Sequence, residues 1–126
     1  MRHLVSAMLI VVALIHLIPV SGALGKDSLA TLYGLSFDDP NLAILMRHRA
    51  VLFGLLGVFI GFAAFRPAYQ PAAFVAGFVS VVSFLGLALA VGGYNAQVGR
   101  VFTADIVALL CLMVGGAAYV YVATKT

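Results

Sequence analysis

Charged residues are scarce in this chain of 126 residues, which holds seven Lys or Arg and four Asp or Glu. Soluble domains carry about 25% charged residues, whereas the fraction here is 9%. Because so few charges cannot cover the surface of a water-soluble globule, we exclude a soluble enzyme and a disordered tail. The seven cations also form no stripe that could neutralise a run of phosphates, which excludes a nucleic-acid binder.

Cysteine is nearly absent as well, since Cys111 is the single one. One thiol can form neither an intramolecular disulfide nor a thiolate metal cage. Cys111 lies among small residues spaced along one helix face, so we interpret it as a packing residue. The sequence also lacks a Ser-His-Asp arrangement, a Gly-rich phosphate loop and a Cys-x-x-Cys pair. Hydrolase, nucleotide and dithiol chemistry therefore have no support in the sequence.

Long apolar runs are abundant, and hydrophobic residues make up 64% of the chain. A membrane-spanning helix needs about 20 mostly apolar residues. Short connections between apolar helices favour antiparallel neighbours. We therefore predict an all-α fold, an integral membrane four-helix up-down bundle that forms one transmembrane domain over residues 1–126. The four predicted helices cover residues 4–20, 40–65, 71–91 and 101–122.

The first apolar run has a second interpretation. Arg2, the apolar stretch after it and the small residues at 21–23 also resemble a signal peptide with its cleavage site. His16 within the run fits a cleaved leader poorly, so we interpret the run as a retained helix. Cations near helix ends favour a cytoplasmic amino terminus, with Arg66 and Lys125 on the same side. The predicted location is multi-pass in a membrane, the inner membrane if the source is bacterial.

Small residues recur at a spacing of three and four along the second and fourth stretches. Because helices in a bilayer associate by close approach of their backbones, these stripes predict tight, left-handed packing. Large residues such as Phe53 and Ile60 are expected to fill gaps or face lipid. The stripes consist of Ala50, Gly54, Gly57, Gly61 and Ala64 in the second stretch and of Ala104, Ala108, Cys111, Gly115 and Ala118 in the fourth.

Polar residues are predicted to gather at one end of the bundle. The end of the first stretch and the starts of the second and fourth lie on the same side, because the helices alternate in direction. At about 1.5 Å per residue, His16, Arg47 and Asp105 then fall within one outer third, while the opposite half is almost purely apolar. The candidate site residues at this end are His16, Tyr33, Arg47, His48, Tyr94, Asn95 and Asp105.

Arg47 and Asp105 each continue a stripe of small residues, so both are predicted to point inward and to pair. A charge at membrane depth costs ~2.5–3.5 kcal/mol on insertion scales, and such groups usually face the bundle interior. Arg49, about 200° around the helix from Arg47, is expected to extend toward the headgroups. A purely structural interpretation stays open, in which the ion pair only fixes helix register and His16 only satisfies a backbone carbonyl.

The first functional hypothesis is a site for an amphipathic small molecule such as a quinone, an isoprenoid or a sterol-like lipid. Its head would meet the candidate residues named above. If redox or isomerisation chemistry occurs, His16 or Asp105 would donate or accept a proton, and Arg47 would stabilise developing negative charge. No metal site is predicted, because no spacing places two His on one helix face. The cofactor is unknown.

The second hypothesis is a non-enzymatic accessory subunit, or a homo-oligomeric scaffold, of a larger membrane complex. In that case the stripes of small residues are interfaces to other chains. The polar end then only locks the helices together.

Five short motifs run along the chain, and they are His16-Leu17-Ile18-Pro19, Leu32-Tyr33-Gly34, Asp38-Asp39-Pro40-Asn41-Leu42, Arg47-His48-Arg49-Ala50-Val51-Leu52-Phe53-Gly54 and Val91-Gly92-Gly93-Tyr94-Asn95. Together they resemble the small four-helix DoxX-like membrane proteins of unknown function, over nearly the whole chain. Such relatives often carry the automatic name phosphopantetheine adenylyltransferase. That soluble enzyme has a doubly wound α/β fold and a His-x-Gly-His element, so we reject the label. The resemblance implies a link to quinone-dependent redox complexes as one option and supplies no catalytic residues.

Overall fold

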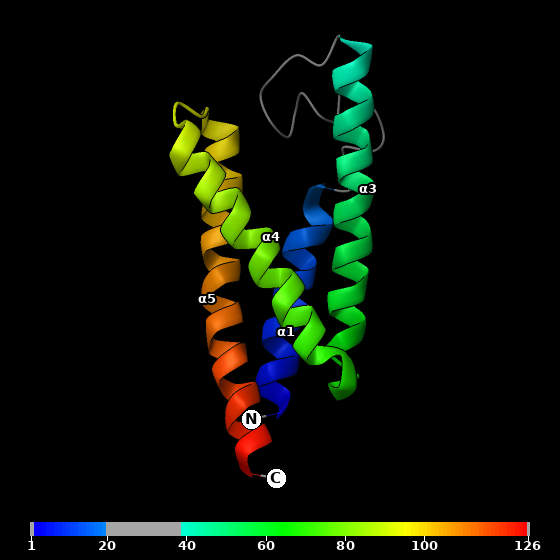
Figure 1. The fold of residues 1–126 in the computed structure, drawn as a ribbon, viewed down its shortest axis with the longest axis vertical. Helices are drawn as coiled ribbons and strands as arrows, with labels where there is room; N and C mark the ends of the chain where they lie inside the picture. Colours follow the sequence, from blue (N-terminus) through cyan, green and yellow to red (C-terminus); the bar gives the residue numbers. More distant parts are fainter. Residues whose placement is uncertain (1, 20–38, 126) are drawn as a thin grey trace.

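The computed structural model describes residues 2–19 and 39–125, and four α-helices follow one another in them (Figure 1). The elements are α1 (Arg2–Leu17), α3 (Pro40–Ala63), the short 3-10 helix η2 (Pro67–Tyr69), α4 (Gln70–Val91) and α5 (Ala96–Lys125). These two described ranges contain no strand. The predicted all-α fold is confirmed.

The start of α3 follows from two neighbouring residues. The Asp39 side chain accepts a hydrogen bond from the backbone N–H of Asn41 at 2.9 Å, as the N-cap of a helix does. Pro40 occupies the first helical position, where its missing N–H costs nothing. The predicted start at residue 40 therefore agrees with the structure.

The connection from α4 to α5 is shorter than predicted. Gly92 and Gly93 both have a φ of +67°, a conformation that L side chains rarely adopt, and they end α4. The Asn95 side chain then accepts from the backbone N–H of Val98 at 2.8 Å, which caps a new helix. As a result α5 begins at Ala96 and not at residue 101.

Three segments are long and apolar enough to cross a membrane, namely Pro40–Ala63, Pro67–Val91 and Ala96–Lys125. In their apolar windows only 17%, 22% and 22% of the residues are buried within the chain, so most large apolar side chains point outward. Water contact would cost about 25 cal/mol for each Å² of that surface, whereas lipid tails can cover it. These helices fit a membrane protein. The apolar helix α1 is shorter, at 16 residues.

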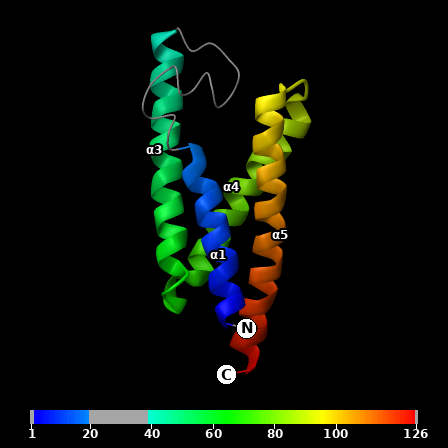
Figure 2. The same ribbon diagram turned by 180° about the vertical axis from the view of Figure 1, so that it is seen from behind.

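Helix α1 lies between α3 and α5 and packs against both, as the two opposite views show (Figures 1 and 2). Helix α4 crosses the bundle from the lower end of α3 to the upper end of α5 (Figure 1). The core therefore forms around α1. Its fully buried large side chains are Leu9, Val12, Ile60, Val81 and Leu112.

Glycines bring α1 close to both of its neighbours. A Cβ atom on Gly57 of α3 would lie 2.9 Å from Cδ2 of Leu17. A Cβ atom on Gly115 of α5 would lie 2.9 Å from Cβ of Met8. Both distances are shorter than a van der Waals contact, so these members of the predicted stripes serve packing inside the chain.

The lower end of the bundle is more polar than the sequence analysis expected. Ser6 Oγ donates to the carbonyl oxygen of Ala64 at 2.6 Å, and Nε2 of the buried Gln70 donates to the same oxygen at 3.4 Å. The expectation of an almost purely apolar half is therefore wrong. The carbonyl groups at the end of a helix lack intrahelical partners, and these two side chains satisfy one of them.

The helices differ in length, and α1 ends first. With 16, 24 and 30 residues, α1, α3 and α5 extend over about 24, 36 and 45 Å. Beyond Leu17 and the single 3-10 turn that follows it, α3 and α5 continue upward and diverge (Figures 1 and 2). The space between them at this level contains the candidate site.

Candidate functional site

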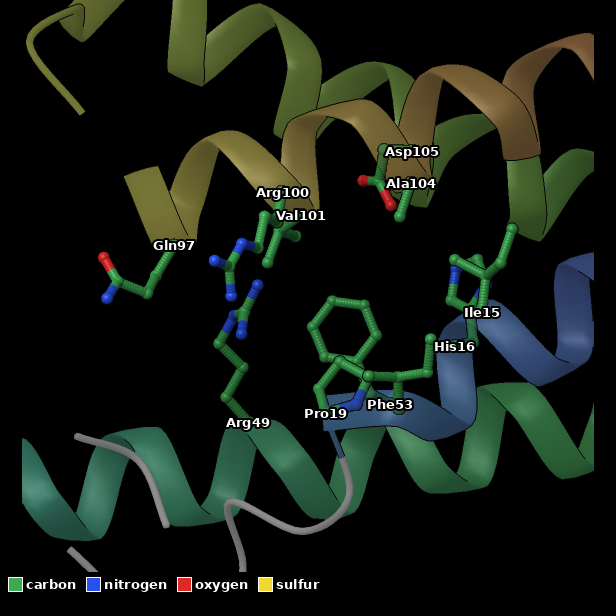
Figure 3. A pocket seen from close by; sticks show the side chains of 11 residues that line it. Ile15, His16, Pro19, Arg49, Phe53, Gln97, Arg100, Val101, Ala104 and Asp105 are labelled. Carbon is green, nitrogen blue, oxygen red and sulfur yellow. The ribbon is translucent and has the colours of Figure 1, made fainter. Parts of the chain in front are cut away.

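A cavity of about 380 Å³ lies where α1 ends between α3 and α5 (Figure 3). Apolar side chains form much of its wall, and they are Ile15, Ile18, Pro19, Phe53, Val101 and Ala104. The polar lining residues are His16, Arg49, Gln97, Arg100 and Asp105. The cavity thus combines a hydrocarbon-like wall with a few ionisable groups.

One face of α5 supplies about half of the lining. Its contributions lie at positions 97, 100, 101, 104 and 105, a spacing of three and four that places side chains on one side of a helix. The sequence analysis did not count Gln97 and Arg100 among the candidate site residues, because it placed the start of the fourth helix at residue 101, after both of them. The signal that could have found them is Asn95, a residue type that favours the N-cap position.

Asp105 is half-buried, and its carboxylate points into the cavity (Figure 3). The positive charge of Arg49 acts on this carboxylate electrostatically. The Arg49 guanidinium carbon lies 4.4 Å from the centroid of the Phe53 ring, in the position of a cation–π contact. An acid within a helix that is long and apolar enough to cross a membrane is therefore accompanied by a cation from a second helix.

The cation beside Asp105 is Arg49, so the predicted inward orientation of Arg47 is wrong. Arg47 is exposed and does not line the cavity, whereas Arg49 is half-buried there. The stripe of small residues is only part of the inner face of α3, because Ile60 is fully buried and Phe53 faces the cavity. Around the helix, Arg49 lies about 40° from Phe53 and Arg47 about 120° from it.

His16 is buried, with 3% of its surface exposed, and both ring nitrogens have partners inside the protein. Nδ1 lies 2.9 Å from the Val12 carbonyl oxygen and Nε2 lies 2.9 Å from Ser80 Oγ. A carbonyl oxygen only accepts, so Nδ1 carries a proton, and when the ring is neutral Nε2 accepts from the Ser80 hydroxyl. His16 therefore joins α1 to α4, while its role in proton transfer stays a prediction.

Three other candidate residues, His48, Tyr94 and Asn95, are described and do not line the cavity. His48 is exposed on α3. The Tyr94 ring stacks on Phe102, with ring centroids 5.6 Å apart, and Asn95 caps α5. Tyr33 lies outside the described residues. Within residues 2–19 and 39–125, no three His, Cys, Asp or Glu side chains come together as metal ligands would.

Comparisons with known proteins leave the chain without an assigned family. No family model, curated protein or solved structure matches it. The resemblance to DoxX-like proteins therefore stays a prediction from short motifs.

Proposed function

We propose that this protein binds an amphipathic small molecule in the membrane, with the polar head of the ligand in the cavity between α3 and α5. The observation that carries this proposal is the Asp105 carboxylate, which points into an otherwise largely apolar cavity from within a membrane-spanning helix. Ionisable residues at such positions commonly mark functional sites. Small-molecule sites are typically cavities of about 300–1,000 Å³ with apolar walls and few polar groups.

The lining suggests how such a ligand is held. Arg49 donates to an oxygen atom of the head, and the Asp105 carboxylate keeps the inner end of the cavity polar. Ile15, Phe53 and Val101 contact the hydrocarbon part of the ligand. A quinone, an isoprenoid or a sterol-like lipid combines these features, and no reaction is needed for this role.

The proposal includes an orientation in the membrane. We place the amino terminus in the cytoplasm, since Arg2 and Lys125 lie at the lower end with the two chain termini and Arg66 follows the lower end of α3 (Figure 1). The cavity then opens in the outer half of the bilayer.

An assembly role as an accessory subunit or homo-oligomer is the alternative. It was motivated by the stripes of small residues. Gly57 and Gly115 contact α1 within the same chain, which accounts for these glycines without a second chain. Ligand binding is therefore the function that we put forward.

Filling the cavity tests the proposal. Ala104 lines the cavity, while its neighbour Thr103 is exposed and does not. The Ala104→Phe variant adds a ring inside the site, and Thr103→Phe adds the same ring outside it. The proteins are purified in mild detergent, and the lipids that copurify are identified by native mass spectrometry and extraction.

We expect a defined lipid with the wild-type protein and with Thr103→Phe, and at least a tenfold loss, roughly 1.4 kcal/mol, with Ala104→Phe. Equal thermal stability of the two variants shows that the loss reflects the blocked cavity. If no preparation retains a defined ligand, or if Ala104→Phe retains it fully, the proposal is wrong.

A further inference from the structure

Two like charges converge at the outer end of the cavity. Arg49 extends from α3 and Arg100 from α5, and their guanidinium groups point toward one another in Figure 3. Repulsion between like charges is stronger near a low-dielectric region than in bulk water. An anion located between the two groups would replace this repulsion with two attractions.

The polar groups are ordered along the cavity. Gln97 and Arg100 lie in the first turns of α5, near the end of the bundle, and Asp105 lies more than one turn deeper. Since Asp105 repels an anion from the inner end, an anion is favoured at the outer end. That is the level at which the head of a membrane lipid resides.

The guanidinium groups suit this partner chemically. A guanidinium presents a rigid fork of N–H donors that matches the oxygen atoms of phosphate and carboxylate groups. The centroid of the Phe53 ring lies 4.4 Å from the Arg49 guanidinium carbon, and this contact helps to orient the Arg49 guanidinium group. Gln97 adds a neutral donor at the same end.

We infer that the cavity selects an amphiphile with an anionic head, a phosphate or a carboxylate held between Arg49 and Arg100. This inference rests on the proposed function and narrows it to one class of ligand. The inner carboxylate of Asp105 then fixes the depth of the head through repulsion.

The test uses three ligands that share one chain and differ only in the head, namely farnesyl phosphate, farnesoic acid and farnesol. Their affinities are measured by native mass spectrometry in a neutral detergent. We expect the better of the two anions to bind at least about tenfold more tightly than the alcohol, as one charged hydrogen-bonded contact provides. If farnesyl phosphate binds more tightly than farnesoic acid, the ligand class is a phosphorylated lipid. If farnesoic acid binds more tightly, the ligand class is a fatty acid.

Three arginine variants test which side chains cause the preference for an anionic head. Arg49→Gln and Arg100→Gln are each expected to lower the affinity for the preferred anion about tenfold and to lower the affinity for farnesol much less. Arg47→Gln, which removes the same charge from an exposed position on α3, is the matched control and should bind as the wild type does. Unfolding temperatures of the variants show whether each is folded.

The outcomes separate this inference from the proposed function. If farnesol binds as tightly as both anions while Ala104→Phe blocks all three ligands, the cavity binds amphiphiles and the anionic inference is wrong. An equal loss with Arg47→Gln also overturns it, because the effect is then general attraction to a positive surface. If Ala104→Phe changes none of the three affinities, the proposed function itself fails.

Discussion

The two halves of the bundle differ in what separates α3 from α5. In the lower half α1 lies between them, and Gly115 lets it approach α5 so closely that no Cβ atom would fit against Met8. In the upper half α1 has ended, and the space contains a cavity of about 380 Å³ lined by apolar side chains and a few charged groups. Similar apolar helices thus form a packed core in one half and enclose a cavity in the other, and the length of a third helix decides which.

The polar groups of the two halves also differ. At the lower end, Ser6 and Gln70 both donate to the carbonyl oxygen of Ala64, so their polar atoms are used within the fold. At the upper end, Arg100 and Asp105 line the cavity. Polar residues near a helix end therefore either satisfy backbone groups within the fold or line a cavity. Only those that line a cavity support the proposal of a ligand.

The largest expected effect tests the packed half. Gly115→Ala places a Cβ atom against Met8 Cβ and the Phe74 ring, at 2.9 and 3.2 Å. We expect a loss of about 1–3 kcal/mol in the free energy of unfolding, as in other overpacked cores. The measurement is unfolding in mixed micelles.

Gly86→Ala is the matched control, since a Cβ atom there meets nothing within 4 Å. It should leave the stability unchanged or raise it slightly. A Gly115→Ala protein as stable as the control would mean that the lower half is less tightly packed than described.

A smaller effect is expected at the boundary between the halves, where His16 bonds to Ser80. The variants His16→Leu and Ser80→Ala and their combination form a double-mutant cycle. Because either single change leaves one partner of the bond unsatisfied, we expect a coupling of about 1 kcal/mol. Strictly additive losses in stability would show that the hydrogen bond adds nothing to the joint between α1 and α4.

The smallest effect is expected at the upper end. Asn95→Ala removes the acceptor for the N–H of Val98 and should cost about 0.5–1 kcal/mol, confined to the first turn of α5. Hydrogen exchange should accelerate at residues 97–99 and remain unchanged in the lower half of α5. Asn95→Asp keeps an acceptor and is the control. Equal acceleration in both variants would contradict the capping role.

Much of the fold could be predicted from the sequence. Apolar runs locate membrane helices, and the pair Asp39 and Pro40 marks the start of α3. The start of α5 was misplaced because Gly92 and Gly93 indicate a turn whose length they do not fix. Asn95 is an equally local signal, and it indicates where that turn ends.

The candidate site could be predicted only in part. Its end of the bundle and the inward direction of Asp105 follow from helix alternation and periodicity, and both agree with the structure. The stripe of small residues could not show that Arg49, and not Arg47, faces the cavity. Small residues show where two backbones approach, whereas Phe53 and Ile60 complete the inner face of α3, and their direction depends on how α1 and α5 are placed.

The hydrogen bond between His16 and Ser80 connects a residue of the cavity wall to α4, which supplies none of the described lining residues. Many side chains of α4 point outward from the bundle. A sideways displacement of α4 must therefore either break this bond or pull the end of α1 with it. The width of the cavity is in this way mechanically coupled to a helix that contributes nothing to its described wall.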